Sequence, residues 1–583
     1  KSLMLFLQVV LEELGTRCRA STAEDLKTVL RRVEDEGLSF LTITLPTFGK
    51  DLEKGLDQGW VDTQLFRSFK RGRGALPQFL GGLLGLIFDR RSGRLLEEPS
   101  IDAIQAIRQV TLMFSKILLP TTDGRNRKAI EKYLECEQHV RETDVSLSEA
   151  DKASFKRIAT LLYGEVLSEV NENVYYGQIV PRHGPGGTVD KLIGNDKYQQ
   201  TEWTSRLERV FPMLEYLVPN PGFYQELDAI TVLEPAQERP VRVVLVPKTM
   251  KTPRIIAIEP TAMQYTQQGL AEALVRAMTR KTLRHSKEAN PLRHLIGFDD
   301  QHPNRVMAKQ GPTREGGLAT LDLSEASDSV SNQLVWLLFK NYTHLAEGVD
   351  ACRSRKADVL GHGVIRLAKF ASMGSALTFP IEAMVFLTII FLGIEQELSH
   401  PVTRKDIKSF VGSVRVFGDD IIVPERFVLA VIERLETFGF RVNAGKSFWT
   451  GRFRESCGRE YYEGQDVSIV KVRRVFPSSL RNVPEIISIV SLRNQLYKAG
   501  YWQTVKWLDT EIEKVLKGAF PAVAETSPVL GRFHFTGYDT HGWNPHTQSP
   551  VVKGYVVRPV IPNRPLDGSG ALLKAFLKRG ELP

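Results

Sequence analysis

Apolar side chains recur at the spacing of an α-helix over long parts of this chain. The pattern is visible in residues 23–36 and 150–170, and it returns in residues 424–440 and 480–516. A helix with one apolar stripe buries that stripe against a neighbouring element. The pattern therefore predicts a chain that is mainly helical towards both ends, and residues 1–180 show no cluster of catalytic side chains.

Shorter apolar segments in the middle of the chain have the length and composition of strands. Residues 230–233 and 241–246 are rich in β-branched residues, and so are the two halves of residues 416–423. Gly, Pro and Asp bound these segments, as they commonly bound strands. The central part of the chain is therefore expected to contribute a sheet.

Two adjacent carboxylates, Asp419 and Asp420, follow Gly418 within residues 416–423. Gly and Asp tolerate the backbone angles of a tight turn, so the pattern predicts a hairpin that holds both carboxylates at its tip. Beside another Asp they would form a site for hard divalent cations. Two such ions can clamp the attacking and leaving oxygens of a phosphoryl transfer. Taken alone, the run fits an ordinary solvated hairpin equally well.

A second acidic segment favours the metal site. The apolar lead of residues 317–321 ends at Asp322, which predicts a strand that holds this carboxylate rigidly at its end. Asp328 lies six positions later, where it can face a substrate instead of a metal. The alternative for Asp328 is an N-cap for a helix over residues 330–340, and capping is compatible with substrate contact.

Three cations, Lys248, Lys251 and Arg254, follow the strand predicted over residues 241–246 at intervals of three. In a loop they can converge on a triphosphate, with arginine making bidentate contacts and lysine acting as a point charge. A solvated basic turn is the simpler interpretation of this spacing by itself.

Composition narrows the class of protein only slightly. The net charge of +9 and pI of about 9.1 fit a nucleic-acid partner, but many proteins without one are as basic. Four widely separated cysteines argue against a disulfide framework or a zinc site. The apolar run of residues 383–394 is too short to span a bilayer and lies between Glu382 and Glu395. We expect a buried helix there, no secretory signal and no membrane association.

Taken in order, these motifs resemble the palm motifs of viral RNA-dependent RNA polymerases. Several stretches are more specific, and resemble the replicases of the single-stranded RNA bacteriophages, the leviviruses. The similarity is dense from about residue 180 to 475 and thin outside these limits. The stretches are HGPGG at 183–187, PKxxKxxR at 247–254 with Glu259-Pro260, DLSEASDS at 322–329, Ser372-Met373-Gly374 with Thr378-Phe379, Gly418-Asp419-Asp420, Lys446, and FRESCG at 453–458 with Tyr461-Tyr462.

The resemblance implies an α+β fold, the right-hand polymerase of fingers, palm and thumb, with an antiparallel palm sheet packed on helices. Residues 1–310 would form an N-terminal region and the fingers, with a basic nucleotide-binding loop at 241–260. Residues 311–475 would form the palm, with the metal-binding motifs and the hairpin that follows them. Residues 476–583 would form the thumb and a C-terminal strap.

The implied activity is that of an RNA-directed RNA polymerase replicating a single-stranded, positive-sense RNA phage genome by two-metal nucleotidyl transfer. Asp322, Asp419 and Asp420 would hold two Mg²⁺ or Mn²⁺ ions, and Lys446 would protonate the leaving pyrophosphate. Substrate contacts would fall to Lys248, Lys251 and Arg254 for the triphosphate, to Asp328 for the ribose, and to Ser372, Gly374 and Thr378 beside the nucleotide or template backbone.

The chain departs from the wider polymerase pattern at Glu382, where many such enzymes have Asn. That departure leaves the partner of Asp328 in sugar recognition open, with Ser375 and Thr378 as candidates.

The resemblance also implies partners. Beside RNA template, RNA product and nucleoside triphosphates, the family works with host elongation factors Tu and Ts and a ribosomal small-subunit protein, in the cytoplasm of the infected bacterial host. The alternatives are a reverse transcriptase, a capsidless-virus RNA polymerase, or an inactive polymerase-like RNA-binding scaffold. Sugar and template choice separate the enzymes from one another. The three aspartates and Lys446 argue against the scaffold.

Overall fold

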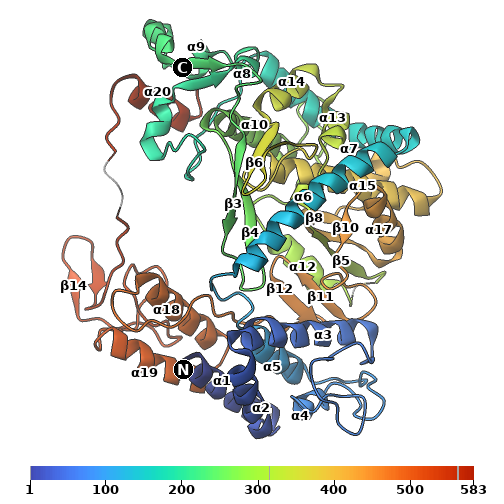
Figure 1. The fold of residues 1–583 in the computed structure, drawn as a ribbon, viewed down its shortest axis with the longest axis vertical. Coiled ribbons are helices and arrows are strands. Elements are labelled where there is room, and N and C mark those ends of the chain that lie inside the picture. Colours follow the sequence, from blue (N-terminus) through green and yellow to red (C-terminus); the bar gives the residue numbers. More distant parts are fainter. Residues whose placement is uncertain (1, 314, 561–563, 583) are drawn as a thin grey trace.

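The computed structural model describes residues 2–313, 315–560 and 564–582. Within these residues, helices surround two four-stranded sheets, and the molecule is elongated, with the N-terminal helices at one end (Figure 1). The mixture of helices and sheets confirms the α+β fold class.

One sheet lies at the centre of the larger part of the molecule. It contains β5 (Leu318–Ser324), β8 (Arg415–Phe417), β9 (Asp420–Pro424) and β10 (Arg441–Val442), in the order β10-β5-β9-β8. All neighbouring strands run antiparallel. The antiparallel sheet that the sequence resemblance implied for residues 311–475 is therefore confirmed.

Helix α15 (Thr378–Leu398) supports this sheet from behind and packs against α7 (Glu149–Tyr175) and α17 (Val428–Thr437). Its side chains from Pro380 to Ile394 are buried. Of the helices in the described ranges, α15 alone is long and apolar enough to cross a membrane, and 83% of that stretch is buried inside the protein. Helix α15 is therefore the buried helix that the sequence predicted. Its N-terminus lies beside the acidic hairpin, where Phe379 contacts Gly418.

The second sheet projects from the body as an extended hairpin and its neighbours (Figure 1). It contains β3 (Val241–Val246), β4 (Arg254–Ile258), β6 (Lys356–Val359) and β7 (Gly363–Arg366), in the order β4-β3-β6-β7. Helix α6 (Asp123–Ser146) packs against β4. The loop between β3 and β4 carries Lys248 and Lys251, and Arg254, the third predicted phosphate-binding cation, is the first residue of β4.

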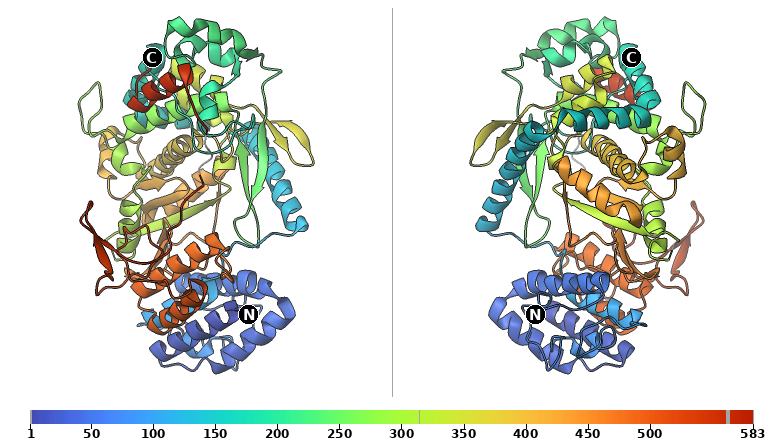
Figure 2. Two further views of the ribbon diagram at one scale, coloured as in Figure 1. Left: turned by 90° about the vertical axis from the view of Figure 1, so that its left-hand side faces the viewer. Right: turned by 90° about the vertical axis from the view of Figure 1, so that its right-hand side faces the viewer.

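The N-terminal helices share a hydrophobic core with helices from the far end of the chain. Helices α1 (Ser2–Cys18), α3 (Leu45–Gln58) and α5 (Ile101–Leu112) pack with α18 (Val483–Lys498) and α19 (Trp502–Val515). Figure 2 shows the two sets of helices side by side in both views. This core is separate from the one around α15.

A second hairpin joins the two cores, and its strands are β11 (Phe453–Ser456) and β12 (Arg459–Tyr462). The segment after α19 contains a short hairpin of β14 (Gly542–Asn544) and β15 (Ser549–Val551), where the sequence predicted only an extended strap. The chain then ends in α20 (Gly568–Arg579), which docks on the larger core at the opposite end of the molecule (Figure 1).

The remaining elements are shorter or lie between those above. They are α2 (Ala23–Glu36), η1 (Phe40–Thr44), α4 (Gly81–Leu84), η2 (Gly194–Gln199), β1 (Glu202–Thr204), α8 (Ser205–Glu208), α9 (Met213–Tyr216), η3 (Pro221–Ala229), β2 (Thr231–Leu233), α10 (Thr261–Thr279), α11 (Leu292–Leu295), α12 (His302–Gln310), η4 (Ser327–Ser329), α13 (Asn332–Phe339), α14 (Thr343–Cys352), α16 (Arg404–Ser409), η5 (Glu425–Phe427) and β13 (Gln465–Asp466).

Glu259, which follows β4, generates a pH prediction. Its carboxylate is buried and accepts a hydrogen bond from the Ser354 hydroxyl. Burial raises its pKa from 4.5 to about 7, against the opposing effects of Ser354, Gln267 and Arg353. The folded chain thus holds this proton where the unfolded chain has lost it. The stability that the group contributes is full below about pH 4.5 and is lost as the pH rises through 7.

Urea unfolding at pH 5 and pH 8 tests this on the wild type and on Glu259→Gln, whose amide stays neutral. The wild type should lose on the order of 3 kcal/mol more than the variant between the two pH values. Equal losses in both proteins would show that Glu259 does not titrate in this range.

Candidate active site

The register of two strands brings the predicted metal aspartates together. In the β5–β9 pair, Asp322 lies directly opposite Asp420. Directly opposed residues of antiparallel strands point to the same face, with Cβ atoms roughly 4.5–5.5 Å apart. Asp419 is exposed in the turn between β8 and β9. The predicted hairpin is thus confirmed, although Asp420 is the first residue of a strand and only Asp419 lies at the tip.

The turn requires glycine at position 418. The backbone of Gly418 has φ +59°, and a Cβ there would lie 2.7 Å from the ring of Phe379. Phe379 in turn packs edge to face on Phe417, with ring centroids 5.5 Å apart. The first turn of α15 therefore fixes the path of the acidic hairpin.

Crowding of the carboxylates changes their protonation. Burial, followed by the charge of Asp419, raises the pKa of Asp420 to about 7, although the Cys457 N–H donates to its Oδ1 at 3.2 Å. Burial also raises the pKa of Asp322, against the effect of Lys446. The site therefore has more negative charge than its own residues neutralise, which is the electrostatic condition for binding a cation.

Lys446 pairs with Asp322, one of the carboxylates of this acidic group. Its Nζ lies 3.3 Å from both carboxylate oxygens of Asp322, and Asn443 Nδ2 donates to Asp322 Oδ2 at 3.0 Å. Among the described residues, no three His, Cys, Asp or Glu side chains are close enough as they stand to enclose a metal ion. The strands bring Asp322 and Asp420 together as a pair, and Asp419 reaches them only through its charge.

The basic loop approaches the acidic site through one of its three predicted cations. Lys248 is close enough to Asp419 and Asp322 for their charges to act on its pKa, which burial and Arg254 lower. The Met250 carbonyl accepts a hydrogen bond from Arg125 Nη1 at 2.9 Å, which fixes the tip of the loop against α6.

Lys251 is exposed on the same loop, and no contact among the described residues ties it to the carboxylates. A cation that the sequence did not single out lies here as well. Burial, followed by Lys248, Lys471, Lys446 and Arg473, lowers the pKa of Lys116 to about 8. Two backbone hydrogen bonds, Leu118 N to Arg473 O and Val472 N to Met113 O, both 2.8 Å long, hold its segment in place.

Asp328 is held by a buried ion pair. Lys369, which is fully buried, lies 3.2 Å from Asp328 Oδ1 and 3.6 Å from the centre of the Tyr133 ring. The alternative of Asp328 as a helix cap is wrong, because Ser331 accepts the hydrogen bond from Gln333 N at the start of α13. Asp328 is therefore a charged group kept at the edge of the site.

The small residues before α15 are fixed by contacts with their surroundings. The hydroxyls of Ser372 and Tyr133 lie 2.9 Å apart, and Thr378 Oγ1 donates to Ser372 O at 3.1 Å. Gly374 has φ +139°, and a Cβ there would lie 1.9 Å from the Ala257 carbonyl oxygen. The close backbone approach is thus to β4 of the protein itself.

Glu382 is the residue at which the chain departs from the wider polymerase pattern. It is buried on α15 beside Ser327, and among the described residues its Oε2 has no hydrogen-bond partner. Burial raises its pKa to about 8, with Ser327 opposing and Asp419 and Asp328 adding to the effect. The two candidates named for this role point elsewhere, since Ser375 bonds to Gln267 and Thr378 to Ser372. Lys369 and Lys116 are the residues of the site that the sequence did not identify, whereas Glu382 was named there only as a departure from the polymerase pattern.

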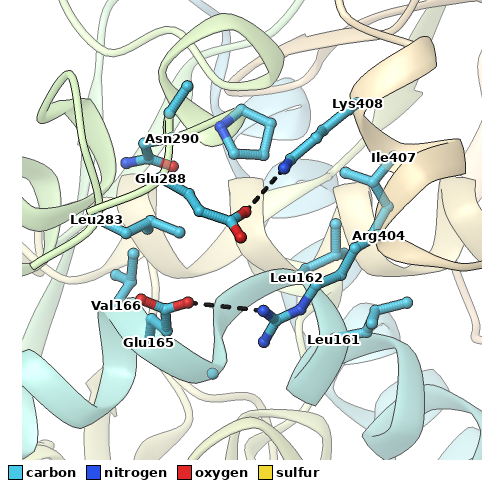
Figure 3. Close-up of a pocket in the computed structure, with 13 residues that line it drawn as sticks. Leu161, Leu162, Glu165, Val166, Leu283, Glu288, Asn290, Arg404, Ile407 and Lys408 are labelled. Carbon is cyan, nitrogen blue, oxygen red and sulfur yellow. Dashed lines mark hydrogen bonds and ion pairs between the residues drawn. The ribbon is translucent and has the colours of Figure 1, made fainter. Parts of the chain in front are cut away.

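A small cavity of about 40 Å³ lies away from this site, between α7, α16 and residues 283–291 (Figure 3). Ion pairs of Glu165 with Arg404 (3.7 Å) and of Glu288 with Lys408 (2.8 Å) close it. The cavity has room for little more than a water molecule, and its ion pairs join α16 to the body.

The acidic hairpin, the basic loop and the Asp328 pair all lie within the part of the chain that matches a known family. The family model described as RNA replicase, beta-chain, matches residues 229–515. The RNA-directed RNA polymerase beta chain of Enterobacteria phage fr is 30% identical over 309 residues, which cover 53% of this chain and 49% of that protein. The beta chain of Escherichia phage MS2 is 35% identical over 231 residues, covering 39% and 37%.

A longer match is to the RNA-directed RNA polymerase subunit beta of Enterobacteria phage SP, at 30% identity over 394 residues, 64% of this chain and 60% of that protein. The matches thus span between 37% and 60% of the length of these relatives. Among solved structures, an RNA-dependent RNA polymerase of BmCPV in its elongation state gives a TM-score of 0.38 at 10% identity, covering 61% of this chain and 33% of that one. Similarity at that level supports no conclusion about this chain.

The tight turn at Gly418 generates a prediction. Gly418→Ala should destabilise the protein in two ways, by the left-handed backbone, at roughly 1–2 kcal/mol, and by the clash with Phe379. Gly361→Ala is the matched control, because Gly361 has φ +78° and open space around its Cα. Chemical denaturation should show the larger loss for position 418. Equal losses would mean that Phe379 yields without cost.

Proposed function

We propose that this chain belongs to the RNA replicase beta-chain family, whose model matches residues 229–515, and that it is an RNA-directed RNA polymerase that copies a single-stranded, positive-sense RNA phage genome. The observation that carries the proposal is the β5–β9 register, which sets Asp322 opposite Asp420 with Asp419 in the adjoining turn. Phosphoryl transfer to a 3′-hydroxyl needs such a carboxylate group beside a cationic triphosphate site.

Divalent cations suit this site, because its carboxylates have raised pKa values and oxygen ligands are those that hard cations prefer. Asp322, Asp419 and Asp420 would hold two Mg²⁺ or Mn²⁺ ions, whose charge would assist loss of the 3′-hydroxyl proton and neutralise the leaving pyrophosphate. The ammonium of Lys446, which lies against Asp322, would have to move away before the ions could bind.

The other residues of the site would position the substrates. Lys248, Lys251 and Arg254, joined by Lys116, would bind the triphosphate and hold its α-phosphorus in line with the 3′-hydroxyl. The Nζ of Lys446 would donate a proton to the leaving pyrophosphate, as a group within hydrogen-bond reach can. Protein catalysis of this kind consists chiefly of positioning and charge neutralisation.

Ribose selection would fall to the group around Asp328. The ion pair with buried Lys369 keeps this carboxylate in a fixed place, where it would accept a hydrogen bond from the ribose 2′-hydroxyl. Glu382 would support it from α15, in place of the Asn of many related polymerases. Ser372, Gly374 and Thr378 would shape the wall of the nucleotide site through the contacts that fix their loop.

The predicted regions and partners complete the proposal. Residues 1–310 would include the fingers, residues 311–475 the palm, and residues 476–583 the thumb and strap. RNA template and product and nucleoside triphosphates follow from the activity. Host elongation factors Tu and Ts, a ribosomal small-subunit protein and the cytoplasm of an infected bacterium are predicted from family resemblance, and co-purification from infected cells tests them.

The metal aspartates give the main test. Asp322→Asn and Asp419→Asn should each lower nucleotide incorporation on an RNA template by roughly two orders of magnitude or more, because several kcal/mol of charge stabilisation are lost. RNA binding should persist, since it depends mainly on cations that contact phosphates. Asp466→Asn, an exposed carboxylate on β13, is the control. Near-normal turnover by either active-site variant would refute the assignment and leave an RNA-binding scaffold.

Sugar choice separates an RNA polymerase from a reverse transcriptase. The wild type should strongly prefer ribonucleotides to deoxyribonucleotides in kcat/KM, because a site built to bond a hydroxyl rejects the analogue that lacks it. Asp328→Ala should narrow the preference, mainly by slowing ribonucleotide use. Equal wild-type values would contradict the RNA polymerase, and an unchanged ratio in the variant would remove Asp328 from sugar recognition.

A further inference from the structure

Glu455 lies where the acidic site meets the N-terminal helices. Strand β11 holds it next to β5, because its backbone N–H donates to Thr320 Oγ1 at 3.3 Å. Two residues further along β5 is Asp322. The carboxylate of Glu455 acts on the pKa values of Asp322, Asp420 and Lys446, so it lies within their electrostatic reach.

Four cations from four segments of the chain act on this carboxylate. Lys50 on α3 lies 3.6 Å from Glu455 Oε2. Burial alone would raise the pKa of Glu455, but Lys50, Lys446, Arg108 and Lys471 outweigh it, so the pKa lies below its usual value. The group is thus a half-buried, ionised carboxylate beside cations that it shares with Glu53, Glu460 and Asp322.

The neighbouring acids differ in how well they are bonded. Arg108 lies 3.0 Å from Glu53 Oε1 and 3.1 Å from Glu460 Oε1, and both glutamates have a lysine partner as well. Glu455 Oε2, in contrast, is buried and accepts no hydrogen bond from any residue that the structure describes. A buried acceptor without a donor is costly, so one would expect a mobile donor to complete it.

Lys446 is a donor whose charge already acts on Glu455. Its ammonium bridges both oxygens of Asp322 at 3.3 Å, and the two carboxylates that raise its pKa are Asp322 and Glu455. An ammonium and a divalent cation compete for the same carboxylate oxygens, because both are held there by charge. Whatever binds at Asp322 in the reaction has to displace Lys446, and nearly half of this side chain is solvent-exposed and able to move.

We propose that Glu455 is a positioning residue that receives the ammonium of Lys446 when a divalent cation takes its place on Asp322. The exchange would lower the cost of metal binding, and it would move Lys446 between two defined positions within the site. This exchange rests on the proposed function, which assigns divalent cations to Asp322 and its neighbouring carboxylates. Lys50 and Arg108 keep Glu455 ionised, so the N-terminal helices would take part in the chemistry of the central sheet.

The test is a double-mutant cycle read by Mn²⁺ affinity, measured by electron paramagnetic resonance on the full chain without nucleotide. Lys446→Met should tighten Mn²⁺ binding, because the competitor is gone. Glu455→Gln should weaken it by roughly tenfold in the wild-type background and by less than roughly twofold in the Lys446→Met background. Asp322→Asn should abolish the signal, which assigns the ion to this site.

Glu460→Gln is the matched control. It removes a carboxylate from the same ionic network that pairs with Arg108 and Lys471 and is not among the main influences on Lys446, so Mn²⁺ affinity should stay within twofold of wild type. If Glu455→Gln weakens binding equally in both backgrounds, Glu455 acts on the ion directly and the proposal is overturned. No change in the wild-type background overturns it as well.

A measurement on the wild type covers the case in which Glu455→Gln does not fold. The rate at which an amine reagent modifies Lys446 should stay low when Mn²⁺ is added, because the ammonium passes to a half-buried carboxylate. A rise of roughly tenfold or more would mean that Lys446 is released to solvent, against the proposal. None of these readouts requires nucleotide incorporation, so a failure of polymerase activity and a failure of the exchange are distinguishable.

Discussion

The repulsion between three carboxylates is the constraint around which the centre of this protein is organised. Main-chain hydrogen bonds of β5 and β9 hold Asp322 opposite Asp420, and the turn at Gly418 adds Asp419. A register shift of one residue would turn each carboxylate to the other face of the sheet, into the apolar residues that α15 covers. The sheet therefore cannot relieve the repulsion by sliding.

The surrounding residues supply the positive charge that this group lacks, and each comes from a different part of the fold. Lys446 bonds to Asp322, Lys248 approaches from the β3–β4 loop, and Lys116 lies behind them on the connection from α5 to α6. Burial, followed by repulsion from the other cations, lowers the pKa of Lys116, just as burial, followed by repulsion from Asp419, raises that of Asp420. The acidic group and the basic group thus face one another across the site, and each is destabilised by repulsion between its own members.

The sequence predicted what is local and missed what depends on distant contacts. The backbone preferences of Gly418, Asp419 and Asp420 predict a turn without any distant contact. The apolar run of α15 predicts a buried helix in the same way. Lys369 lies 41 residues from Asp328, and nothing near it in the chain marks it as the partner. Its role arises only because η4 and the segment before α15 pack together.

Competition between neighbouring residues explains the smaller errors. Asp328 looked like a cap for the next helix, but Ser331 lies closer to the helix start and bonds Gln333 N instead. The helix expected from residue 424 begins at Val428, because Pro424 still belongs to β9 and a short 3₁₀ turn follows it. Tertiary pairing of β9 with β5 decides that boundary, and helical periodicity carries no information about it.

The core shared by α1 and α19 has a consequence for how the protein is made. Phe6 packs on Phe476 and Trp507, with ring centroids 5.4 and 6.0 Å away, and Glu13 accepts a hydrogen bond from the Thr504 hydroxyl at 2.6 Å. At about 5–20 residues per second, the ribosome needs roughly 25–100 s to reach the partners of helix α1. Until then α2 and α5 can cover only part of its apolar face. Helix α1 thus completes its packing late, and a chain interrupted before residue 476 would leave part of that face open to aggregation or to a chaperone.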